Sequence, residues 1–387
     1  MATLLGCLGY CESNQKKLEK MLSSITIPVR QSFGKTHFGR NFAATQISLN
    51  PHTQNHSYFD EYQGLYLWVD GEVYSNTHTN KYSIHQNDSN FATEFLDSYS
   101  ASNLSEFLSK IDGYFVAVLY NSHKHEIVIA TDRYGMQLLY LSIENGCLYW
   151  ASEVKSILSI RANSSFDNDL IPFFIEIGHL PATKTWFKEI ELAPPASIIT
   201  FNLQEQRAKY FQYWGFGNIT PNKISFEDAV IYGGELLQQA ISKRFSTNER
   251  IGIPLSGGLD SRVIVSGIMK EHPTYRGSAF SFGPKNCTDV RIAQEVTRLS
   301  KWDHRLYSLG IDDWLEKRIE QIWATDGQFD IAHMHSVECA REESDMIDVA
   351  ISGYLGDIIL GGGWLNSTGL NNRASPNSVK LYRQGSR

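Results

Sequence analysis

The chain has 387 residues, of which 42% are hydrophobic and 20% charged, and its formal net charge is −7. The length suggests two domains, or three. The hydrophobic and charged fractions are ordinary for a globular protein. The acidic balance and the scattered Lys and Arg argue against a nucleic-acid partner. We find no apolar run of the roughly 18 residues that span a membrane and no signal-peptide pattern. Five cysteines without metal-ligand spacing favour a reducing, cytoplasmic location.

The first 213 residues predict many strands and few long helices. Strands are expected at 3–10, 43–49, 113–120, 126–131, 138–142 and 147–151, and helices at 14–23, 91–99 and 105–110. Residues 64–74, GLYLWVDGEVY, place two apolar runs around Asp70-Gly71, which favours a β-hairpin. A further helix begins near residue 152, with Ser152 as its cap. The pattern indicates an α+β sandwich over residues 1–213.

A polar stretch, 203–225, connects this part to a second one. After an amphipathic helix at 226–245, strand patterns alternate with helical patterns. The strands are expected at 251–255, 278–282, 304–308 and 349–352, and the helices at 290–299, 314–323 and 336–343. Such alternation is typical of a parallel sheet with helices on both faces, here residues 214–387. Ligands of such domains bind at the carboxyl ends of the strands.

One loop at such a strand end has the composition of an anion site. Apolar residues 251–255 lead into Ser256-Gly257-Gly258-Leu259-Asp260-Ser261, and a helical pattern follows. Backbone N–H groups at a helix start attract anions, and glycine lets a phosphate approach closely. Asp260 would repel phosphate unless it held Mg²⁺. The alternative is a simple glycine turn with a serine cap. The six residues resemble the pyrophosphate loop of N-type ATP pyrophosphatases.

A second glycine-rich loop follows the strand at 348–351. It reads SGYLGDIILGG over residues 352–362 and delivers one carboxylate, Asp357. Two aspartates on neighbouring strand ends, Asp260 and Asp357, could share one Mg²⁺. The alternative is a loop with a capping aspartate and no ligand.

The combined motifs resemble the asparagine synthetase family (the glutamine-hydrolysing class B enzymes) along nearly the whole chain. SGGLDS, then FSFG at 280–283, then SGYLGDIILGG are similar to its synthetase domain. DGEVYSN at 70–76, ATDRYGMQLLY at 130–140 and WASEVKSIL at 150–158 are similar to its glutaminase domain. The resemblance implies an Ntn-hydrolase-like sandwich, followed by an ATP-pyrophosphatase domain of the adenine nucleotide α-hydrolase type.

The resemblance also implies cofactors, ATP and Mg²⁺, and the residues that bind them. Asp260 and Asp357 would hold the metal and act in catalysis. The remaining contacts would hold pyrophosphate or lie beside the nucleoside, and they are Leu255, Ser256, Gly257, Gly258, Leu259, Ser261, Phe282, Ser352 and Gly353.

The first half departs from the family pattern at its reaction centre. The family's nucleophile is a cysteine at position 2, whereas this chain has Ala2, and alignment on Gly9-Tyr10 puts Leu5 in its place. Cys7 has no free terminus beside it. Gln46 stands where the family has a glutamine-binding arginine. The residues of a vestigial glutamine pocket are Asp70, Gly71, Glu72 and Asp88. We therefore predict that this domain does not hydrolyse glutamine.

The second half departs as well. Tyr354 replaces a family glutamate and resembles the β-lactam synthetase branch, related to the lasso-peptide cyclases, where a tyrosine helps to deprotonate an internal amine. A packing aromatic is the alternative for Tyr354. Residues 214–387 look short at the C-terminus compared with the family, whose helical end brings a catalytic lysine, and Lys380 is a poor substitute.

These features predict an AMP-forming carbon–nitrogen ligase. It would adenylate the carboxylate of a small molecule or peptide, release pyrophosphate and pass the acyl group to an amine donor. Two alternatives stay open: glutamine-dependent asparagine synthesis, and a degenerate or truncated nucleotide-binding paralogue without activity. A homodimer, or a partner chain that completes the C-terminal part, is also open. We expect neither nucleic acid nor membrane as partners.

Overall fold

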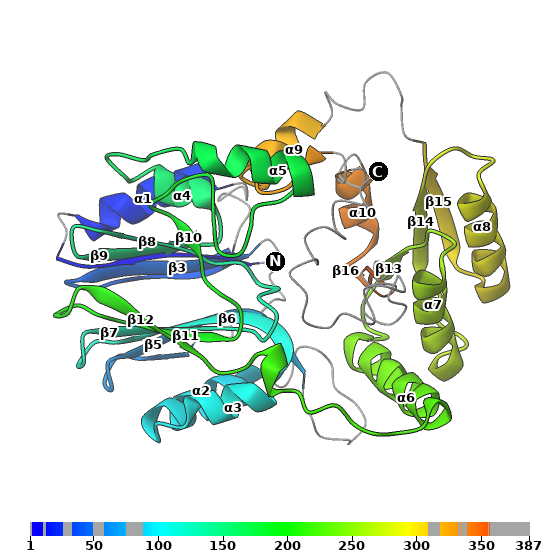
Figure 1. The fold of residues 1–387 in the computed structure, drawn as a ribbon, viewed down its shortest axis with the longest axis horizontal. Helices are drawn as coiled ribbons and strands as arrows, with labels where there is room; N and C mark the ends of the chain where they lie inside the picture. The colour runs from blue at the N-terminus through cyan, green and yellow to red at the C-terminus, as the bar shows by residue number, and fades with distance from the viewer. Residues whose placement is uncertain are drawn as a thin grey trace. The chain divides into compact units, whose positions relative to one another are not determined.

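The structure is a computed structural model that describes residues 2–10, 13–25, 33–48, 58–74, 88–308, 318–331, 334, 339–354 and 356. It forms two compact units (Figure 1). The first contains Met1–Ile224 and Leu315–His335, and the second contains Ser225–Trp314 and Ser336–Arg387. The return of the chain to the first unit near residue 315 was not anticipated from the sequence. The boundary after residue 213 stays a prediction.

The first unit contains two six-stranded sheets in which every pairing between neighbouring strands is antiparallel. One sheet has the order β10 (Glu191–Leu192), β8 (Tyr140–Glu144), β9 (Cys147–Ala151), β1 (Ala2–Leu8), β3 (Phe42–Ser48), β2 (Phe33–Phe38). The other has the order β12 (Arg207–Gln212), β11 (Ser197–Asn202), β7 (Glu126–Thr131), β6 (Asp112–Asn121), β5 (Leu65–Tyr74), β4 (Tyr58–Asp60). A buried cluster that includes Leu4, Trp68, Val118 and Trp150 lies between them.

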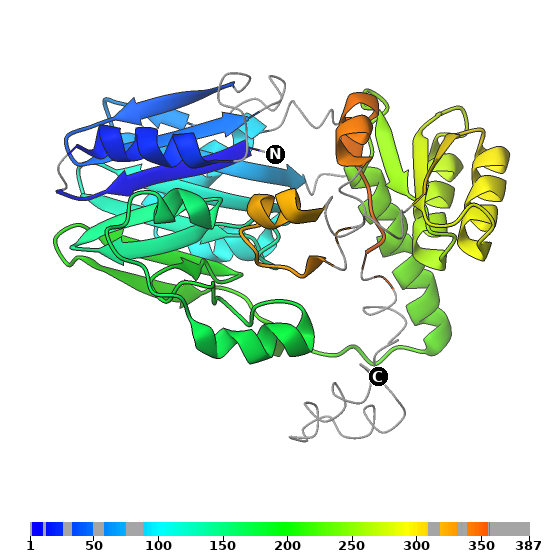
Figure 2. The same ribbon diagram turned by 90° about the horizontal axis from the view of Figure 1, so that it is seen from above.

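Helices cover both outer faces of the sandwich. Leu18 and Met21 of α1 (Asn14–Ser24) pack on the first sheet together with α4 (Val154–Leu158), and Figure 2 shows α1 running along this sheet. Phe95 of α2 (Asp88–Ser100) and Leu108 of α3 (Leu104–Lys110) pack on the second sheet. Strand residues alternate between the two faces, so both faces of each sheet are apolar. The expected α+β sandwich is confirmed.

Residues 64–74 correct one expectation. They form a single strand, β5, whose register with β6 runs without a break from Leu65 opposite Asn121 to Tyr74 opposite Asp112. Gly71 has φ +111°, and a Cβ atom on it would lie 2.0 Å from the carbonyl oxygen of Tyr114. Asp70-Gly71 therefore marks a local irregularity within a strand, not the hairpin turn that the dipeptide predicted.

The start of α4 (Val154–Leu158) differs from the expectation that Ser152 caps this helix. Ser152 does not cap this helix, because its Oγ accepts a hydrogen bond from the N–H of Leu4. The carboxylate of Asp326 instead accepts from the N–H groups of Val154 and Lys155, at 2.6 and 3.3 Å. The segment that holds Asp326 follows α9 (Ile319–Ala324), which belongs to the first unit with α5 (Ile171–Ile177). A distant part of the chain thus caps the helix.

The second unit has a four-stranded parallel sheet in the order β15 (Asp303–Tyr307), β14 (Ser278–Phe282), β13 (Ile251–Pro254), β16 (Val349–Ala350). Both views place α7 (Leu259–Glu271) and α8 (Thr288–Ser300) on one side of this sheet and α10 (Ala340–Met346) on the other (Figures 1 and 2). Ile241 of α6 (Phe226–Arg244) joins the core under α7. The expected α/β domain is confirmed.

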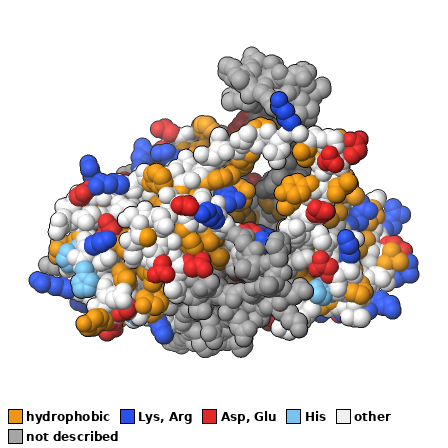
Figure 3. Space-filling model, turned by 90° about the horizontal axis from the view of Figure 1, so that it is seen from below, with side chains coloured by type: hydrophobic (Ala, Val, Ile, Leu, Met, Phe, Trp, Pro, Cys, Tyr) orange, Lys and Arg blue, Asp and Glu red, His pale blue; other side chains and the backbone are white. Residues whose placement is uncertain are grey.

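Two general features bear on the compositional expectations. Cys7, Cys287 and Cys339 carry free thiols, whereas Cys147 is disulfide-bonded, which the expectation of a reducing location did not include. Within the described ranges no helix has the length and apolarity needed to cross a membrane. On the face shown in Figure 3, the coloured side chains of Lys and Arg are interspersed with those of Asp and Glu.

Candidate functional site

The loop between β13 and α7 is held by the neighbouring strand β14. The buried Leu255 donates its N–H to the carbonyl of Phe280 at 2.8 Å, and its carbonyl accepts from Oγ of Ser281 at 2.6 Å. Gly257 has φ +76°, and a Cβ atom there would lie 2.8 Å from the carbonyl oxygen of Asp289. Only glycine combines this backbone conformation with such close packing.

Polar groups of the loop gather at the start of α7. The N-cap, Gly258, makes no side-chain cap, so no side chain competes with an anion for the first-turn N–H groups. Ser256 is exposed, and the N–H of Gly258 points to its Oγ at 3.4 Å. Ser261 is buried, and its hydroxyl donates to the carbonyl of Gly258 at 3.3 Å. A helix start that follows two glycines suits an anion, and the phosphate-binding role of this loop stays a prediction.

The second loop lies directly against Asp260. β16 runs parallel to β13, and the N–H of Ile351 donates to Gly252 at 2.9 Å, so the chain leaves the sheet beside the first loop. A Cβ atom on Gly353 would lie 2.8 Å from Cβ of Asp260. On Gly356 it would lie 2.7 to 3.0 Å from all three carboxyl atoms of Asp260. The two glycines leave the room that this carboxylate occupies.

A magnesium ion would need hard oxygen ligands at this point. Asp260 supplies a half-buried carboxylate on the first turn of α7, and the backbones of Gly353 and Gly356 pack closely against it. Asp357, the second expected ligand, lies outside the described residues. Among the described residues no group of three or more His, Cys, Asp or Glu side chains could hold a metal. Asp260 supplies one hard oxygen donor for such an ion, and its pairing with Asp357 stays a prediction.

The other expected contacts surround the same strand ends. Phe282 ends β14, and its ring stacks on Tyr307 of β15 with the centroids 5.8 Å apart. Ser352 accepts the N–H of Tyr354 at 3.1 Å. The side chains of Leu259 and Tyr354 are 70% and 83% exposed, so both face solvent in this unit. The exposed ring of Tyr354 argues against the packing alternative.

Two residues beneath the loop were not found from the sequence. Oγ of Ser281 donates to Leu255 and lies 3.0 Å from Nε2 of His304. Since the only hydroxyl proton is used, Nε2 carries the proton in this contact. Burial lowers the pKa of His304. The one signal was a serine between the buried Phe280 and the half-buried Phe282 of β14.

Polar residues at and near the expected vestigial glutamine pocket make hydrogen bonds with other parts of the sandwich. Gln46 of β3 is buried and donates from Nε2 to the carbonyl of Val69 on the facing sheet at 2.6 Å. The buried carboxylate of Asp70 accepts a hydrogen bond from Nε2 of Gln137. Glu72 accepts from the hydroxyl of Tyr74 at 2.8 Å. Asp88 begins α2. Internal hydrogen bonds thus engage Gln46, Asp70 and Glu72.

Leu5 and Cys7, the residues at and near the expected position of the nucleophile, lack the properties of a catalytic nucleophile. Leu5 is fully buried in β1. Cys7 is also fully buried, its Sγ lies 3.5 Å from Oδ1 of Asn14, and burial raises its thiol pKa to about 12. A nucleophilic cysteine needs a lowered pKa and access to solvent. Cys7 has the environment of a structural residue.

The chain joins an antiparallel sandwich to a parallel-sheet unit that has a glycine-rich loop between a strand and a helix. A family model described as a glutamine amidotransferase domain matches residues 1–214, and one described as asparagine synthase matches residues 233–386. The chain belongs to the asparagine synthase family. Membership of its second domain implies the use of ATP.

Similar proteins are distant. The asparagine synthetase [glutamine-hydrolyzing] 1 of Bacillus subtilis is 23% identical over 258 residues, which cover 66% of this chain and 40% of that protein. A putative asparagine synthetase of Methanocaldococcus jannaschii is 24% identical, over 66% of this chain and 50% of its own. The alignments thus span half or less of these relatives. A solved allosteric regulatory enzyme of purine biosynthesis is 12% identical, covers 94% of this chain and 92% of its own, and has a TM-score of 0.39.

Proposed function

We propose that this protein is an ATP-dependent ligase that adenylates a carboxylate with release of pyrophosphate and then passes the acyl group to an amine. The observation that carries the proposal is the contact of two glycine loops around one carboxylate. Gly353 and Gly356 leave no space for a side chain beside Asp260, at the start of a helix whose N–H groups favour an anion.

The roles of the chain's own groups follow from this geometry. The N–H groups after Gly257 and the hydroxyl of Ser256 bind the β- and γ-phosphates and hold them while the α–β bond breaks. Asp260 and Asp357 would hold Mg²⁺, which offsets charge on the leaving pyrophosphate. Phe282, Ser352 and Gly353 flank the nucleoside. The Phe282–Tyr307 stack fixes the wall on which the base would lie.

The amine does not come from glutamine hydrolysis in this proposal. Ala2 offers no nucleophile, Cys7 is buried with a raised pKa, and Gln46 cannot supply the permanent charge with which an arginine would hold the substrate carboxylate. Ammonia or an amine on the substrate itself takes that place. The exposed side chain of Tyr354 supports the second source, the chemistry of the β-lactam synthetase and lasso-peptide cyclase branch.

An ATP–pyrophosphate exchange assay with a panel of amino acids, peptides and other carboxylic acids tests the adenylation step. We expect acid-dependent exchange that Asp260→Asn lowers by more than about 100-fold, since the charge acts in the transition state, while ATP binding changes far less. Asp303→Asn is the matched control, because Asp303 is exposed at the opposite end of β15. Equal loss of exchange and ATP binding in Asp260→Asn would give the carboxylate a structural role only.

The same assay separates the other two functions. ATP binding without exchange for any acid supports a nucleotide-binding paralogue without ligase activity. Exchange with aspartate, together with glutamate release from glutamine, supports glutamine-dependent asparagine synthesis.

A further inference from the structure

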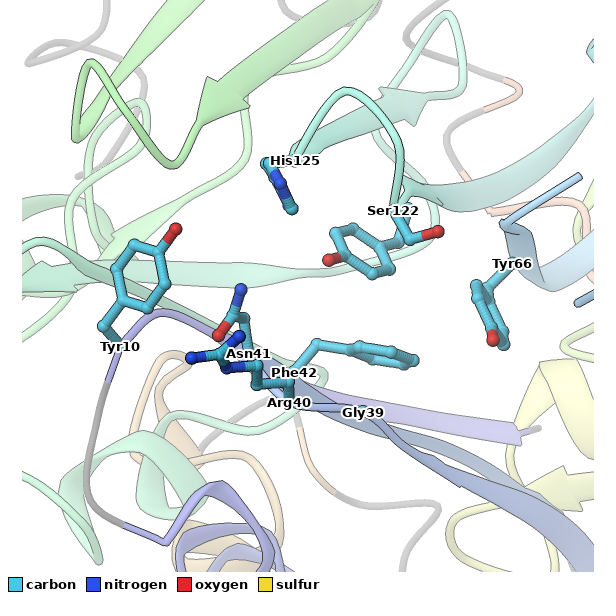
Figure 4. Close-up of a pocket in the computed structure, with 9 residues that line it drawn as sticks. Tyr10, Gly39, Arg40, Asn41, Phe42, Tyr66, Ser122 and His125 are labelled. Atoms are coloured by element: carbon cyan, nitrogen blue, oxygen red, sulfur yellow. The ribbon is translucent and has the colours of Figure 1, made fainter.

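A cavity of about 420 Å³ opens at one end of the first unit's sandwich (Figure 4). Its walls come from the end of β1, the β2–β3 turn, the start of β5 and the β6–β7 turn. Gly39 closes the β2–β3 turn by donating its N–H to the carbonyl of Phe42 at 2.9 Å. The N–H of Gly9 donates to the carbonyl of Asn41 at 2.8 Å. The cavity therefore has a fixed backbone frame and a volume in the range of small-molecule sites.

The inner wall is aromatic. The ring of Phe42 lies 4.5 Å from that of Tyr120 and 5.0 Å from that of Tyr66, centroid to centroid. These three rings continue the buried cluster between the sheets out to the cavity. A flat or apolar ligand body would cover this wall and be removed from water.

The rim carries polar groups that the described protein leaves without partners. Asn41 is 8% exposed, yet its side chain makes no hydrogen bond with the described residues. Nδ1 of His125 is buried and likewise without a partner there. In Figure 4, Tyr10, Asn41 and His125 point toward a common space. Buried polar groups are almost always hydrogen-bonded, so Nδ1 of His125 calls for a ligand or water.

The charge of the rim is positive. Arg40 is exposed, and within the described ranges it has no ion pair or hydrogen bond. No carboxylate is among the residues that line the cavity. Arginine presents several N–H donors in a fork that matches a carboxylate. The hydroxyls of Tyr10 and Tyr120 add donors, and burial raises the pKa of Tyr120 to about 12, so it stays a neutral donor.

We propose that this cavity binds a small organic carboxylate with a flat, apolar body. Its carboxylate lies against Arg40 and Asn41, and its body covers Phe42 and Tyr120. The site differs from the vestigial glutamine pocket. Gln46 and Asp70 lie four residues further along β3 and β5 than Phe42 and Tyr66, or about 13 Å at about 3.3 Å per residue. It does not depend on the proposed ligase activity.

Titration of the whole chain with benzoate, followed by ligand-observed NMR and calorimetry, tests this site. We expect saturable binding that is at least about tenfold weaker for the neutral isostere benzamide, because the amide cannot form the charge-assisted hydrogen bond with Arg40. Arg40→Gln is expected to weaken benzoate about tenfold, and Tyr120→Phe about fivefold. The exposed Arg40 has no role in the fold, so its variant should unfold at the wild-type temperature.

Lys124→Gln is the matched control. Lys124 belongs to the same β6–β7 turn, but its ammonium lies over the ring of Tyr99 at 4.7 Å and does not line the cavity. It should leave benzoate affinity unchanged. The proposal is overturned if benzoate shows no saturable binding, if benzamide binds equally well, or if Arg40→Gln and Lys124→Gln behave alike. None of these results depends on pyrophosphate exchange.

Discussion

Lys155 and Asp326 form an ion pair of 3.0 Å across 171 residues of sequence, and both side chains are more than nine-tenths buried. Glu153 lies 2.5 Å from the same ammonium, and the carbonyl of Trp323 accepts from it at 2.8 Å. Burial raises the pKa of Asp326, although the ammonium of Lys155 opposes the shift. The pair joins a late segment of the chain to the early sandwich.

Asp326→Ala should therefore destabilise the first unit strongly. It leaves Lys155 buried with one partner fewer and removes the cap of α4, and loss of one member of a buried pair costs about 3 kcal/mol or more. Urea unfolding followed by tryptophan fluorescence measures the change. Glu106→Ala is the control, because the Glu106–Lys110 pair is 67% exposed on both sides and should contribute little. A similar small effect for both variants would contradict the structural role of the pair.

Gly353→Ala should abolish most pyrophosphate exchange while the protein stays folded. The added methyl group would lie 2.8 Å from Cβ of Asp260 and force the second loop away from the first. A displacement of this size at a reaction centre costs roughly 100-fold in rate. Gly233→Ala places the same methyl group on α6, where nothing lies within 4 Å, and should leave exchange intact. Wild-type exchange in Gly353→Ala would show that the two loops do not act together.

The free energy of unfolding of the second unit should fall as the pH is lowered below the pKa of a free histidine side chain. The pKa of His304 is lowered by burial, so the unfolded chain binds the proton more readily than the folded one. The stabilisation from the neutral imidazole is present above an unfolded pKa of about 6.5 and is lost as the pH falls through the lower folded value. His304→Asn should flatten the curve of unfolding free energy against pH in this window. An unchanged curve would exclude His304 as the cause.

Cys7 should react very slowly with iodoacetamide at neutral pH. The thiol is fully buried and its pKa is raised to about 12, so little thiolate forms and the reagent cannot reach it. Cys287, at the start of α8, is partly exposed and should react first. Peptide mass spectrometry gives both rates in one sample. Fast alkylation of Cys7 in the native protein, with release of glutamate from glutamine, would restore the case for a glutaminase.

The sequence located most elements because their apolar patterns are local. The strand at 126–131 and the helix at 226–245 have strong periodicity and appear as β7 and α6. The position of the first loop between a strand and a helix was also predicted from local sequence, since glycine and serine after a strand restrict the backbone to few arrangements. Its proximity to the second loop was expected because both loops end neighbouring strands, and the contact of Gly353 with Asp260 agrees with that expectation.

The errors came from interactions between distant residues. Asp70-Gly71 has the composition of a turn, but the register with β6 and the bond from Gln137 keep it in a strand. Ser152 has the composition of a cap, but Asp326 takes that position. The Ser281–His304 contact, and the cavity around Arg40, form only when separate strands meet. Local sequence patterns contain no information about contacts between residues that are distant in the sequence.

The discontinuity of the first unit has a consequence for synthesis on the ribosome. When residues 1–224 have emerged, both sheets can form, yet the ammonium of Lys155 still lacks Asp326, because about a hundred further residues must be made first. Most of the second unit is translated in that interval. The amidotransferase-type half therefore reaches its final state only after much of the ligase-type half has left the exit tunnel, and a pause near residue 250 would expose an unfinished sandwich to misfolding.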